Sequence, residues 1–212
     1  MWKYIQEDQF FTNEDYNLLM QEVYKINLLS VEPNKIKITS NKIYKSGDVK
    51  NECLTKDLLK KFHQKYHQKL IKYLDDLYPG KSKLYDYSDF HIVATGKDCS
   101  FPIHDDIPCK LLSVVIYLHP EKNSGTTIYS SKEGSDEKEI GWKKNRALIF
   151  ARKKGKTWHS YKGNGIENRI TLVYNLCSLD EFAVNKFENP NYKKLNFYKD
   201  KLSNYIKEKI IS

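Results

Sequence analysis

Two histidines and an aspartate in the second half of the sequence are the side chains best suited to hold a metal ion. His104 and Asp106 are separated by one residue, and on a β-strand this spacing sends both side chains to the same face, where they can chelate one ion. Asp105 would point the other way, so we expect it beside the site or in solvent. His159 can supply a third ligand from a distant strand. Two imidazoles and one carboxylate on one face of a metal leave the opposite positions open, an arrangement that suits non-haem Fe(II).

A turn signal lies midway between His159 and Arg169. It is the Gly-Asn-Gly sequence at 163–165, and a hairpin centred on its asparagine would place His159 and Arg169 nearly opposite each other. The guanidinium could then enter the cavity that holds the metal and grip a carboxylate with two parallel hydrogen bonds. Thr171 shares the face of Arg169 and could donate a further hydrogen bond, and Tyr117 lies on a neighbouring predicted strand. The pattern therefore predicts a metal at one end of a pocket and a carboxylate clamp at the other.

Cationic residues are abundant, but arginines are scarce. The formal net charge is +9, and among the 36 lysines and arginines only Arg146, Arg152 and Arg169 are arginines. Each arginine is therefore an exception that calls for a geometric explanation. The lysines are scattered through every segment instead of forming one tract, which favours a solvated surface over a nucleic-acid partner.

The composition bounds the class of protein. A chain of 212 residues with 40% hydrophobic and 30% charged residues is typical of one globular domain spanning residues 1–212. No apolar run approaches the roughly 20 residues of a membrane-spanning helix, so we expect no membrane partner. The first eight residues lack the apolar stretch of a signal peptide, which favours a cytoplasmic location. The sequence carries no signal for oligomeric state. The cysteines fall at no metal-finger or redox spacing and are expected to be reduced thiols: Cys53, Cys99, Cys109 and Cys177.

The N-terminal region, residues 1–84, is predicted to consist mainly of helices that support a sheet. Apolar residues at helical spacing, with Thr12 and Asp15 as a capping box, predict a helix over 12–29. A short alternating stretch predicts a strand over 35–39. A longer amphipathic pattern predicts a second helix from Thr55 to Tyr78, ended by the following Pro-Gly.

The central region, residues 85–178, changes to short β-rich runs separated by turn residues, the pattern of a sandwich or barrel. A C-terminal extension, residues 179–212, is predicted to hold a helix over 196–211. The fold class is therefore mostly β with flanking helices. The expected strands are Asp89 to Thr95, Ile103 to Asp106, Lys110 to Leu118, Thr126 to Ser130, Arg146 to Ala151, Thr157 to Tyr161 and Arg169 to Leu176.

The order of motifs in this region resembles the Fe(II)/2-oxoglutarate-dependent dioxygenase superfamily, and in particular its prolyl hydroxylase-like branch. The resemblance covers about residues 85–178 and implies a double-stranded β-helix, a jelly-roll or cupin-like core of two sheets packed by the N-terminal helices. The motifs that carry it are His104-x-Asp106, the strand Leu111 to Leu118, Ser124-Gly125-Thr126, the strand Asn145 to Phe150, His159, and Arg169-x-Thr171.

The resemblance also implies roles for individual residues. His104, Asp106 and His159 would bind Fe(II), and Arg169 would bind the distal carboxylate of 2-oxoglutarate. Tyr117 matches a position that often hydrogen-bonds the same carboxylate, and Thr171 would donate a further hydrogen bond to it. Because the carboxylate ligand is present at 106, the resemblance favours hydroxylation over halogenation.

The implied reaction uses O2 and 2-oxoglutarate to hydroxylate a C–H bond of a peptidyl proline, an amino acid or another small substrate, with release of succinate and CO2. The charged stretch Lys132 to Glu139 is a candidate lid or a plain solvated loop. One alternative within the enzyme class is oxidation of a nucleic-acid base, which no basic-aromatic cluster supports. A second alternative is a non-catalytic β-barrel that binds a metal or ligand, in which Arg169 would have no purpose.

Other histidines have simpler interpretations. His63 and His67 are four residues apart on the second predicted helix, but no further ligand accompanies them, so we expect them on the helix surface. His119 precedes a proline and is expected in a loop. His91 shares a strand face with Val93 and would either line the pocket or be a satisfied core residue.

Overall fold

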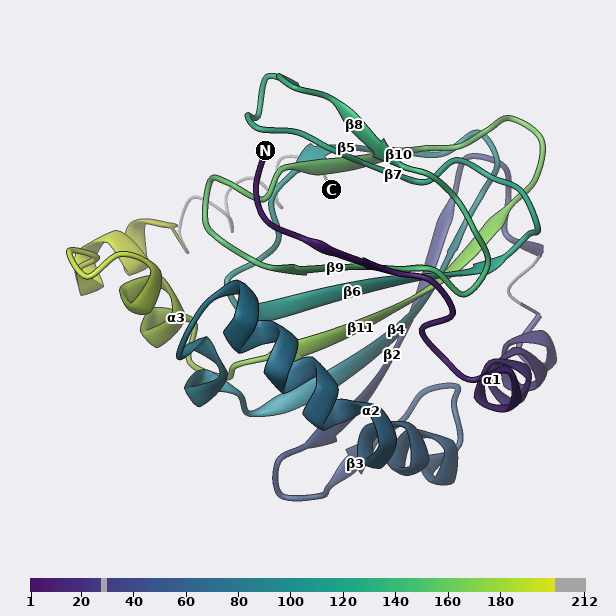
Figure 1. Cartoon of the computed structure of the whole chain (residues 1–212), viewed down its shortest axis with the longest axis horizontal. Helices are drawn as coiled ribbons and strands as arrows, with labels where there is room; N and C mark the ends of the chain where they lie inside the picture. Colours follow the sequence, from purple (N-terminus) through teal and green to yellow (C-terminus); the bar gives the residue numbers. More distant parts are fainter. Residues whose placement is uncertain (28–29, 201–212) are drawn as a thin grey trace.

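Two antiparallel β-sheets lie face to face, with helices on the outer side of the larger one (Figure 1). The computed structural model describes residues 1–27 and 30–200. The larger sheet has the strand order β1-β9-β6-β11-β4-β2-β3, and the smaller sheet has the order β5-β10-β7-β8. The strands are β1 (Ile5–Glu7), β2 (Ile36–Tyr44), β3 (Val49–Lys50), β4 (Tyr87–Thr95), β5 (Ser100–His104), β6 (Lys110–His119), β7 (Thr126–Ile128), β8 (Lys138–Ile140), β9 (Ala147–Ala151), β10 (His159–Lys162) and β11 (Arg169–Cys177).

The helical segments are α1 (Asn13–Lys25), α2 (Lys56–Leu77), the 3-10 helix η2 (Lys81–Leu84) and α3 (Glu181–Glu188). Both long helices begin at threonine caps, since Thr12 accepts a hydrogen bond from the Asp15 amide and Thr55 accepts one from the Leu58 amide. Within residues 1–27 and 30–200, none of the helices has the length and apolar character required to cross a membrane.

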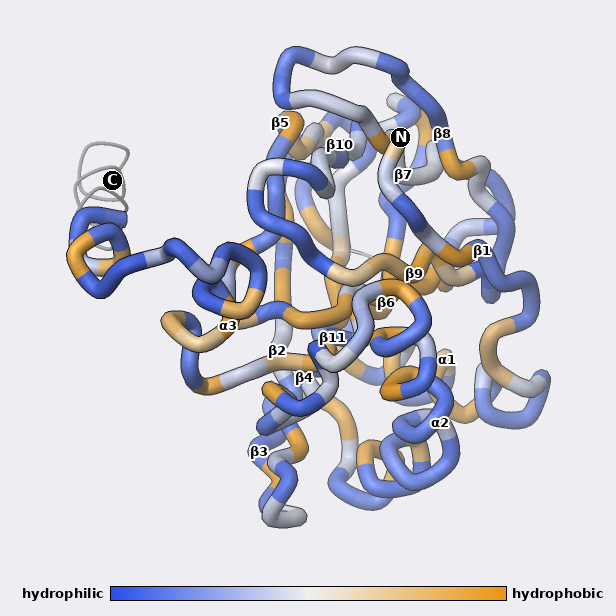
Figure 2. Tube along the Cα trace, turned by 60° about the vertical axis from the view of Figure 1, so that its left-hand side comes forward, coloured by the Kyte–Doolittle hydropathy of each residue, from blue (hydrophilic) through white to orange (hydrophobic). Residues whose placement is uncertain are grey.

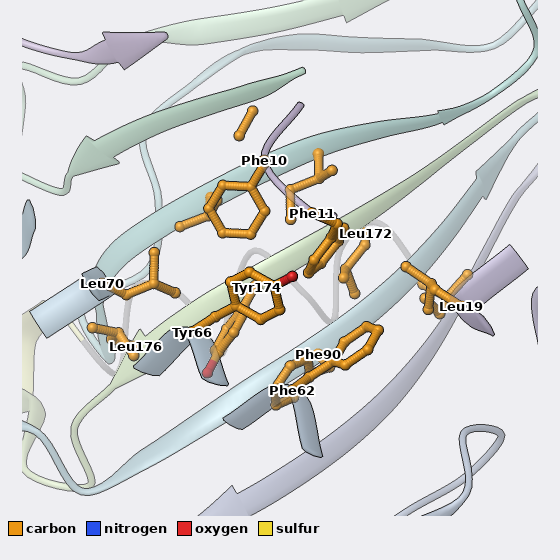
Figure 3. Packing of buried hydrophobic residues seen from close by; sticks show 14 of the residues in the cluster. Phe10, Phe11, Leu19, Phe62, Tyr66, Leu70, Phe90, Leu172, Tyr174 and Leu176 are labelled. Atoms are coloured by element: carbon orange, nitrogen blue, oxygen red, sulfur yellow. The ribbon is translucent and has the colours of Figure 1, made fainter. Parts of the chain in front are cut away.

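The main hydrophobic core lies between α2 and the outer face of the larger sheet. Phe62 and Tyr66 of α2 pack with Phe11 against strand residues such as Phe90 and Tyr174 (Figure 3). The rings of Phe90 and Tyr174 lie 4.0 Å apart on adjacent strands. Figure 2 shows the hydrophobic segments gathered in the strands and on the buried sides of the helices. This packing fixes the larger sheet as a rigid floor for the space between the sheets.

Alternation along β11 assigns its two faces. Ile170, Leu172, Tyr174 and Leu176 point toward the helices and are fully buried, as the sequence pattern predicts. The alternate positions Arg169, Thr171 and Val173 line a cavity between the sheets. The sheet therefore has one apolar face for packing and one face with polar side chains.

The sequence-based prediction of a mostly β fold with flanking helices is confirmed, and several boundaries differ. Helix α1 ends at Lys25, earlier than the predicted residue 29, and residues 28–29 lie outside the described part. Of the helix predicted over 196–211, residues 201–211 lie outside the described part. The strand predicted at 35–39 extends to Tyr44, and the region 1–84 contributes three strands to the larger sheet. Part of the candidate lid is strand β8. All four cysteines are free thiols.

The strand predicted from Ile103 to Asp106 is wrong at its end. Strand β5 ends at His104, and the chain then turns away from the sheet. The cause is the side chain of Asp105, which accepts hydrogen bonds from the Gly155 amide at 2.7 Å and from Thr157 Oγ1 at 2.6 Å. Asp105 therefore anchors the turn that carries Asp106.

The predicted hairpin between His159 and Arg169 is also wrong. Strand β10 pairs with β5 and β7, whereas β11 lies between β6 and β4, so the two strands belong to different sheets. The Gly163 amide donates to the Cys99 carbonyl at 2.8 Å, and the Gly165 amide donates to the Lys97 carbonyl at 3.0 Å. A Cβ on Gly163 would lie 2.0 Å from the Lys97 carbonyl oxygen, so only glycine fits there. These contacts lead the chain from one sheet to the other.

Candidate active site

A cavity of about 340 Å³ lies between the two sheets. Its walls come from β2, β4, β6, β9 and β11 of the larger sheet and from β5, β7 and β10 of the smaller one, together with the segment after β5. It contains His104, Asp106, His159, Arg169 and Thr171 among its lining residues. Five of the six site residues expected from the sequence thus line one cavity, although the strands reach it by a different path from the predicted hairpin.

The two histidines and the aspartate lie close together in the wall of this cavity. His104 and His159 are directly opposite each other in the pairing of β5 with β10, and their ring centroids are 4.2 Å apart. Asp106 joins them from the turn after β5. One ligand atom from each residue lies within 4.8 Å of the others, and in the described part of the chain no other group of three or more such side chains is this compact.

Backbone contacts set the orientation of both imidazole rings. Nδ1 of His104 donates to the Pro102 carbonyl at 2.9 Å, and Nδ1 of His159 donates to the Thr157 carbonyl at 2.9 Å. The lone pair of each ring is therefore on Nε2, the atom left to bind a metal. Burial lowers the pKa of His159, which favours the neutral form that a metal needs.

The carboxylate of Asp106 is held from two sides. Lys110 Nζ donates to Oδ1 at 2.6 Å, and Ser113 Oγ donates to Oδ2 at 2.6 Å. Burial alone would raise the pKa of Asp106, but the positive charge of Lys110, the interaction with His159 and these hydrogen bonds lower it overall. Asp106 is therefore an ionised carboxylate in a fixed position, and sequence analysis did not identify its two partners.

Arg169 lies in the same cavity as an unpaired buried cation. Its side chain is 6% exposed, and its guanidinium carbon lies 3.2 Å from the ring centroid of Tyr161. Nη1 donates to the Ser124 carbonyl at 3.4 Å, while Nε is buried without a hydrogen-bond partner. Burial lowers the pKa of Arg169 to about 10, so it stays protonated at neutral pH. Among the described residues, no carboxylate pairs with it, which leaves its charge available to an anion.

Tyr117 does not line the cavity. Its hydroxyl donates to the Ile140 carbonyl at 3.1 Å and accepts from the Thr126 amide at 2.9 Å, so both of its polar functions are engaged by backbone. Its ring stacks on Trp142 at 4.6 Å, and the Trp142 ring in turn faces Arg169. The structure thus places Tyr117 behind the wall that supports Arg169.

Tyr161 is a further cavity residue that sequence analysis missed, besides Lys110 and Ser113. It lines the cavity with His159, two positions before it on β10, and its ring is the surface on which Arg169 rests. The signal was present, because residues two apart on a strand share a face. The hydroxyl of Tyr161 donates to Asn123 Oδ1 at 3.2 Å, which fixes the ring.

The remaining histidines are placed by their packing. His91 lines the cavity, and its Nε2 is 2.9 Å from a carboxylate oxygen of Asp89. The expectation that His63 and His67 lie on the helix surface is wrong, because their rings stack at 4.2 Å and His67 packs on Tyr85 beneath α2. The helix turns them inward because positions 59, 63, 67 and 70 share one side of it, and Leu59 and Leu70 are buried.

The fold matches solved structures of known oxygenases. No model of a known protein family matches the sequence, and no curated protein matches it. A prolyl-4-hydroxylase from Pseudomonas putida is similar with a TM-score of 0.58 and 13% identity over 84% of this chain and 93% of that one. A prolyl hydroxylase from Trichoplax adhaerens, solved in complex with a hypoxia inducible factor peptide fragment, has a TM-score of 0.59 and 15% identity over 90% of this chain and 87% of that one.

A third similar structure is an oxidoreductase of the 2OG-Fe(II) oxygenase family from Burkholderia pseudomallei. Its TM-score is 0.56 at 14% identity, and the match covers 82% of this chain and 84% of that one. At identities this low the similarity establishes the fold, and it confirms the resemblance to prolyl hydroxylase-like 2OG-Fe(II) oxygenases at that level.

Proposed function

We propose that this chain is an Fe(II)- and 2-oxoglutarate-dependent dioxygenase, a hydroxylase whose facing sheets form a double-stranded β-helix over residues 85–178. The observation that carries the proposal is the pairing of two features in one cavity. One is the compact His104, Asp106 and His159 group, and the other is Arg169, a buried cation with an unpaired Nε. A non-catalytic barrel would gain nothing from a buried cation in the wall of the cavity that holds a candidate metal site.

The donor set fits iron. His104 and His159 present Nε2, and Asp106 is ionised, so these three residues would hold Fe(II) on one face. Arg169 would bind the distal carboxylate of 2-oxoglutarate, with Thr171 two positions along β11 as a further donor. Bound together, Fe(II), 2-oxoglutarate and O2 supply the oxidising power to hydroxylate a C–H bond, with release of succinate and CO2.

The protein's own residues orient the co-substrate and exclude water. The guanidinium of Arg169 is held against the ring of Tyr161, which restricts the orientations in which it can donate to a carboxylate. The apolar side chains Val93, Val115 and Val173 line the same cavity as Arg169 and the proposed metal ligands. A dry wall of this kind strengthens the attraction between Arg169 and a carboxylate. We propose that Tyr117 supports Arg169 only indirectly, because its ring stacks on Trp142 and the Trp142 ring faces Arg169.

The proposed substrate is a peptidyl proline, an amino acid or another small molecule. Apolar side chains that are exposed to solvent surround the cavity: Ile38 at 51%, Phe101 at 36% and Ile107 at 59%. An exposed apolar rim suits a peptide or small substrate better than a nucleic-acid backbone, which would call for a basic rim. The Trichoplax adhaerens structure holds a peptide fragment, which adds support for a peptide substrate. A cytoplasmic location remains a prediction.

The proposal is tested by succinate formation from 2-oxoglutarate in the presence of Fe(II) and O2. His104→Ala and Arg169→Ala should each abolish turnover, because the first removes a metal ligand and the second removes the carboxylate clamp. Matched controls are His119→Ala and Arg146→Ala, at positions outside the cavity, which should turn over like the wild type. Unchanged succinate formation in either cavity variant contradicts the proposal. A mass-spectrometric search for a product heavier by one oxygen atom among peptides, amino acids and oligonucleotides then identifies the substrate.

A further inference from the structure

We propose that Arg152 and Glu188 are positioning residues for the metal ligand Asp106, so that helix α3 is part of the architecture of the metal centre. The inference rests on the proposed function, because it assigns these residues to the site where Fe(II) would bind. Neither residue lines the cavity, and neither belongs to a motif that sequence analysis related to the metal.

Arg152 connects the metal ligand to α3 directly. It follows β9 and is buried, and its Nε donates to the backbone carbonyl of Asp106 at 3.1 Å. Its Nη1 donates to Glu188 Oε2 at 2.9 Å. One rigid guanidinium therefore joins the turn that carries Asp106 to the last residue of α3.

Glu188 is held in place by three donors. Lys81 Nζ donates to Oε1 at 2.6 Å, and the Lys154 amide donates to Oε2 at 2.9 Å, in addition to Arg152. A carboxylate at the C-terminus of a helix is disfavoured by the helix dipole. The position of Glu188 is therefore explained by these donors and not by the stability of α3 itself.

The loop of residues 152–157, which begins at Arg152, also contacts the proposed metal ligand His159. Asp105 accepts hydrogen bonds from two residues of this loop, Gly155 and Thr157. The carbonyl of Thr157 then accepts from Nδ1 of His159 at 2.9 Å. Glu188 on one side and Asp105 on the other thus fix a loop that orients both Asp106 and His159.

Stability alone does not account for this cluster. Lys81, Arg152 and Glu188 are almost completely buried, at 0%, 3% and 3% side-chain exposure. Buried ion clusters of this kind are often no more stable than well-packed apolar residues of similar volume. Apolar residues could not hold the metal ligand in place as this cluster does, because they cannot donate a hydrogen bond to the carbonyl of Asp106.

The test is the affinity of the full chain for Mn²⁺, measured by calorimetry on metal-free protein. Glu188→Gln removes the charge that fixes Arg152, and Arg152→Lys keeps the positive charge but replaces the fork that reaches both partners. Each variant should bind Mn²⁺ at least about tenfold more weakly than the wild type, the usual effect of losing a residue that orients a metal ligand. Glu14→Gln, the same change at an exposed ion pair with Lys61, is the matched control and should bind normally.

Melting temperatures of the metal-free variants separate positioning from general destabilisation. A purely structural role would lower the melting temperature and leave Mn²⁺ affinity unchanged well below it, and that result overturns the inference. If Glu188→Gln does not fold, Arg152→Lys decides alone, and the visible absorption of its Co²⁺ form should differ from the wild type because the ligand geometry changes. Wild-type protein that fails to bind Mn²⁺ would contradict the proposed function instead, so the two failures are distinguishable.

Discussion

Arg169 rests on the ring of Tyr161, with its guanidinium carbon 3.2 Å from the ring centroid, and it lines the same cavity as His104, Asp106 and His159 while its Nε is buried without a hydrogen-bond partner. A buried cation is unfavourable unless something compensates for its lost hydration. The aromatic face does so in part. A bound anion would compensate for the rest of the lost hydration.

Replacing Arg169 with methionine should eliminate 2-oxoglutarate binding while making the ligand-free protein more stable. Methionine fills much of the same space without burying a charge. For a chain of this size, a gain of about 1 kcal/mol raises the melting temperature by about 2–4 °C. Calorimetric titration of 2-oxoglutarate into the Mn²⁺ form, together with melting curves of the metal-free protein, checks both parts. A less stable variant that still binds 2-oxoglutarate would show that Arg169 is a structural residue.

Tyr161→Leu should weaken 2-oxoglutarate binding about tenfold, which corresponds to about 1.4 kcal/mol and lies within the range of a desolvated cation–π contact. Tyr161→Phe keeps the ring and loses only the hydrogen bond to Asn123, so its affinity should stay within about twofold of the wild type. Equal losses in the two variants would mean that the hydroxyl, and not the aromatic face, positions Arg169.

Strand periodicity was sufficient to predict which side chains of β11 line the cavity. Ile170, Leu172 and Tyr174 alternate with Arg169 and Thr171, and only one register buries the first set. The two long helices α1 and α2 were also predictable, because an apolar stripe and a threonine cap are local signals. The short helix α3 was not predicted. Residue types and one short spacing were sufficient to predict that His104, Asp106 and His159 lie together, and their role as metal ligands stays a prediction.

Features that depend on distant contacts were not predictable. A Gly-Asn-Gly turn is compatible with a hairpin and with a crossing between sheets, and the hydrogen bonds that decide it come from residues 97–99. Alternation puts Tyr117 on the inner face, but its ring extends to the carbonyl of Ile140 on β8, a strand too short to be recognised. The partners of Asp106 likewise become visible only after the turn at Asp105 brings them together.

Tyr117→Phe tests the role that the structure gives to this residue. Its hydroxyl bridges the Thr126 amide and the Ile140 carbonyl, both of which would be left unpaired. We expect a loss of about 1–3 kcal/mol in the free energy of unfolding, with 2-oxoglutarate affinity changed less than about threefold. Urea unfolding and calorimetry measure the two quantities. A tenfold loss of affinity at unchanged stability would instead support the direct contact with 2-oxoglutarate that the family resemblance implies.

Acid should destabilise the protein through the stacked pair beneath α2. Burial, reinforced by the neighbouring His63, lowers the pKa of His67 to about 4 in the folded protein, against an ordinary value of 6.5. Between these values the unfolded chain binds more protons than the folded one, so the free energy of unfolding falls as the pH decreases from about 6.5 toward 4.

His67→Phe keeps a ring against His63 and Tyr85 and removes this titration. Urea midpoints at pH 7 and pH 5 should therefore differ less in the variant than in the wild type. The difference will not vanish, because burial also lowers the pKa of His63 and His159. An unchanged difference between the two pH values would mean that His67 is not the residue that carries the acid sensitivity.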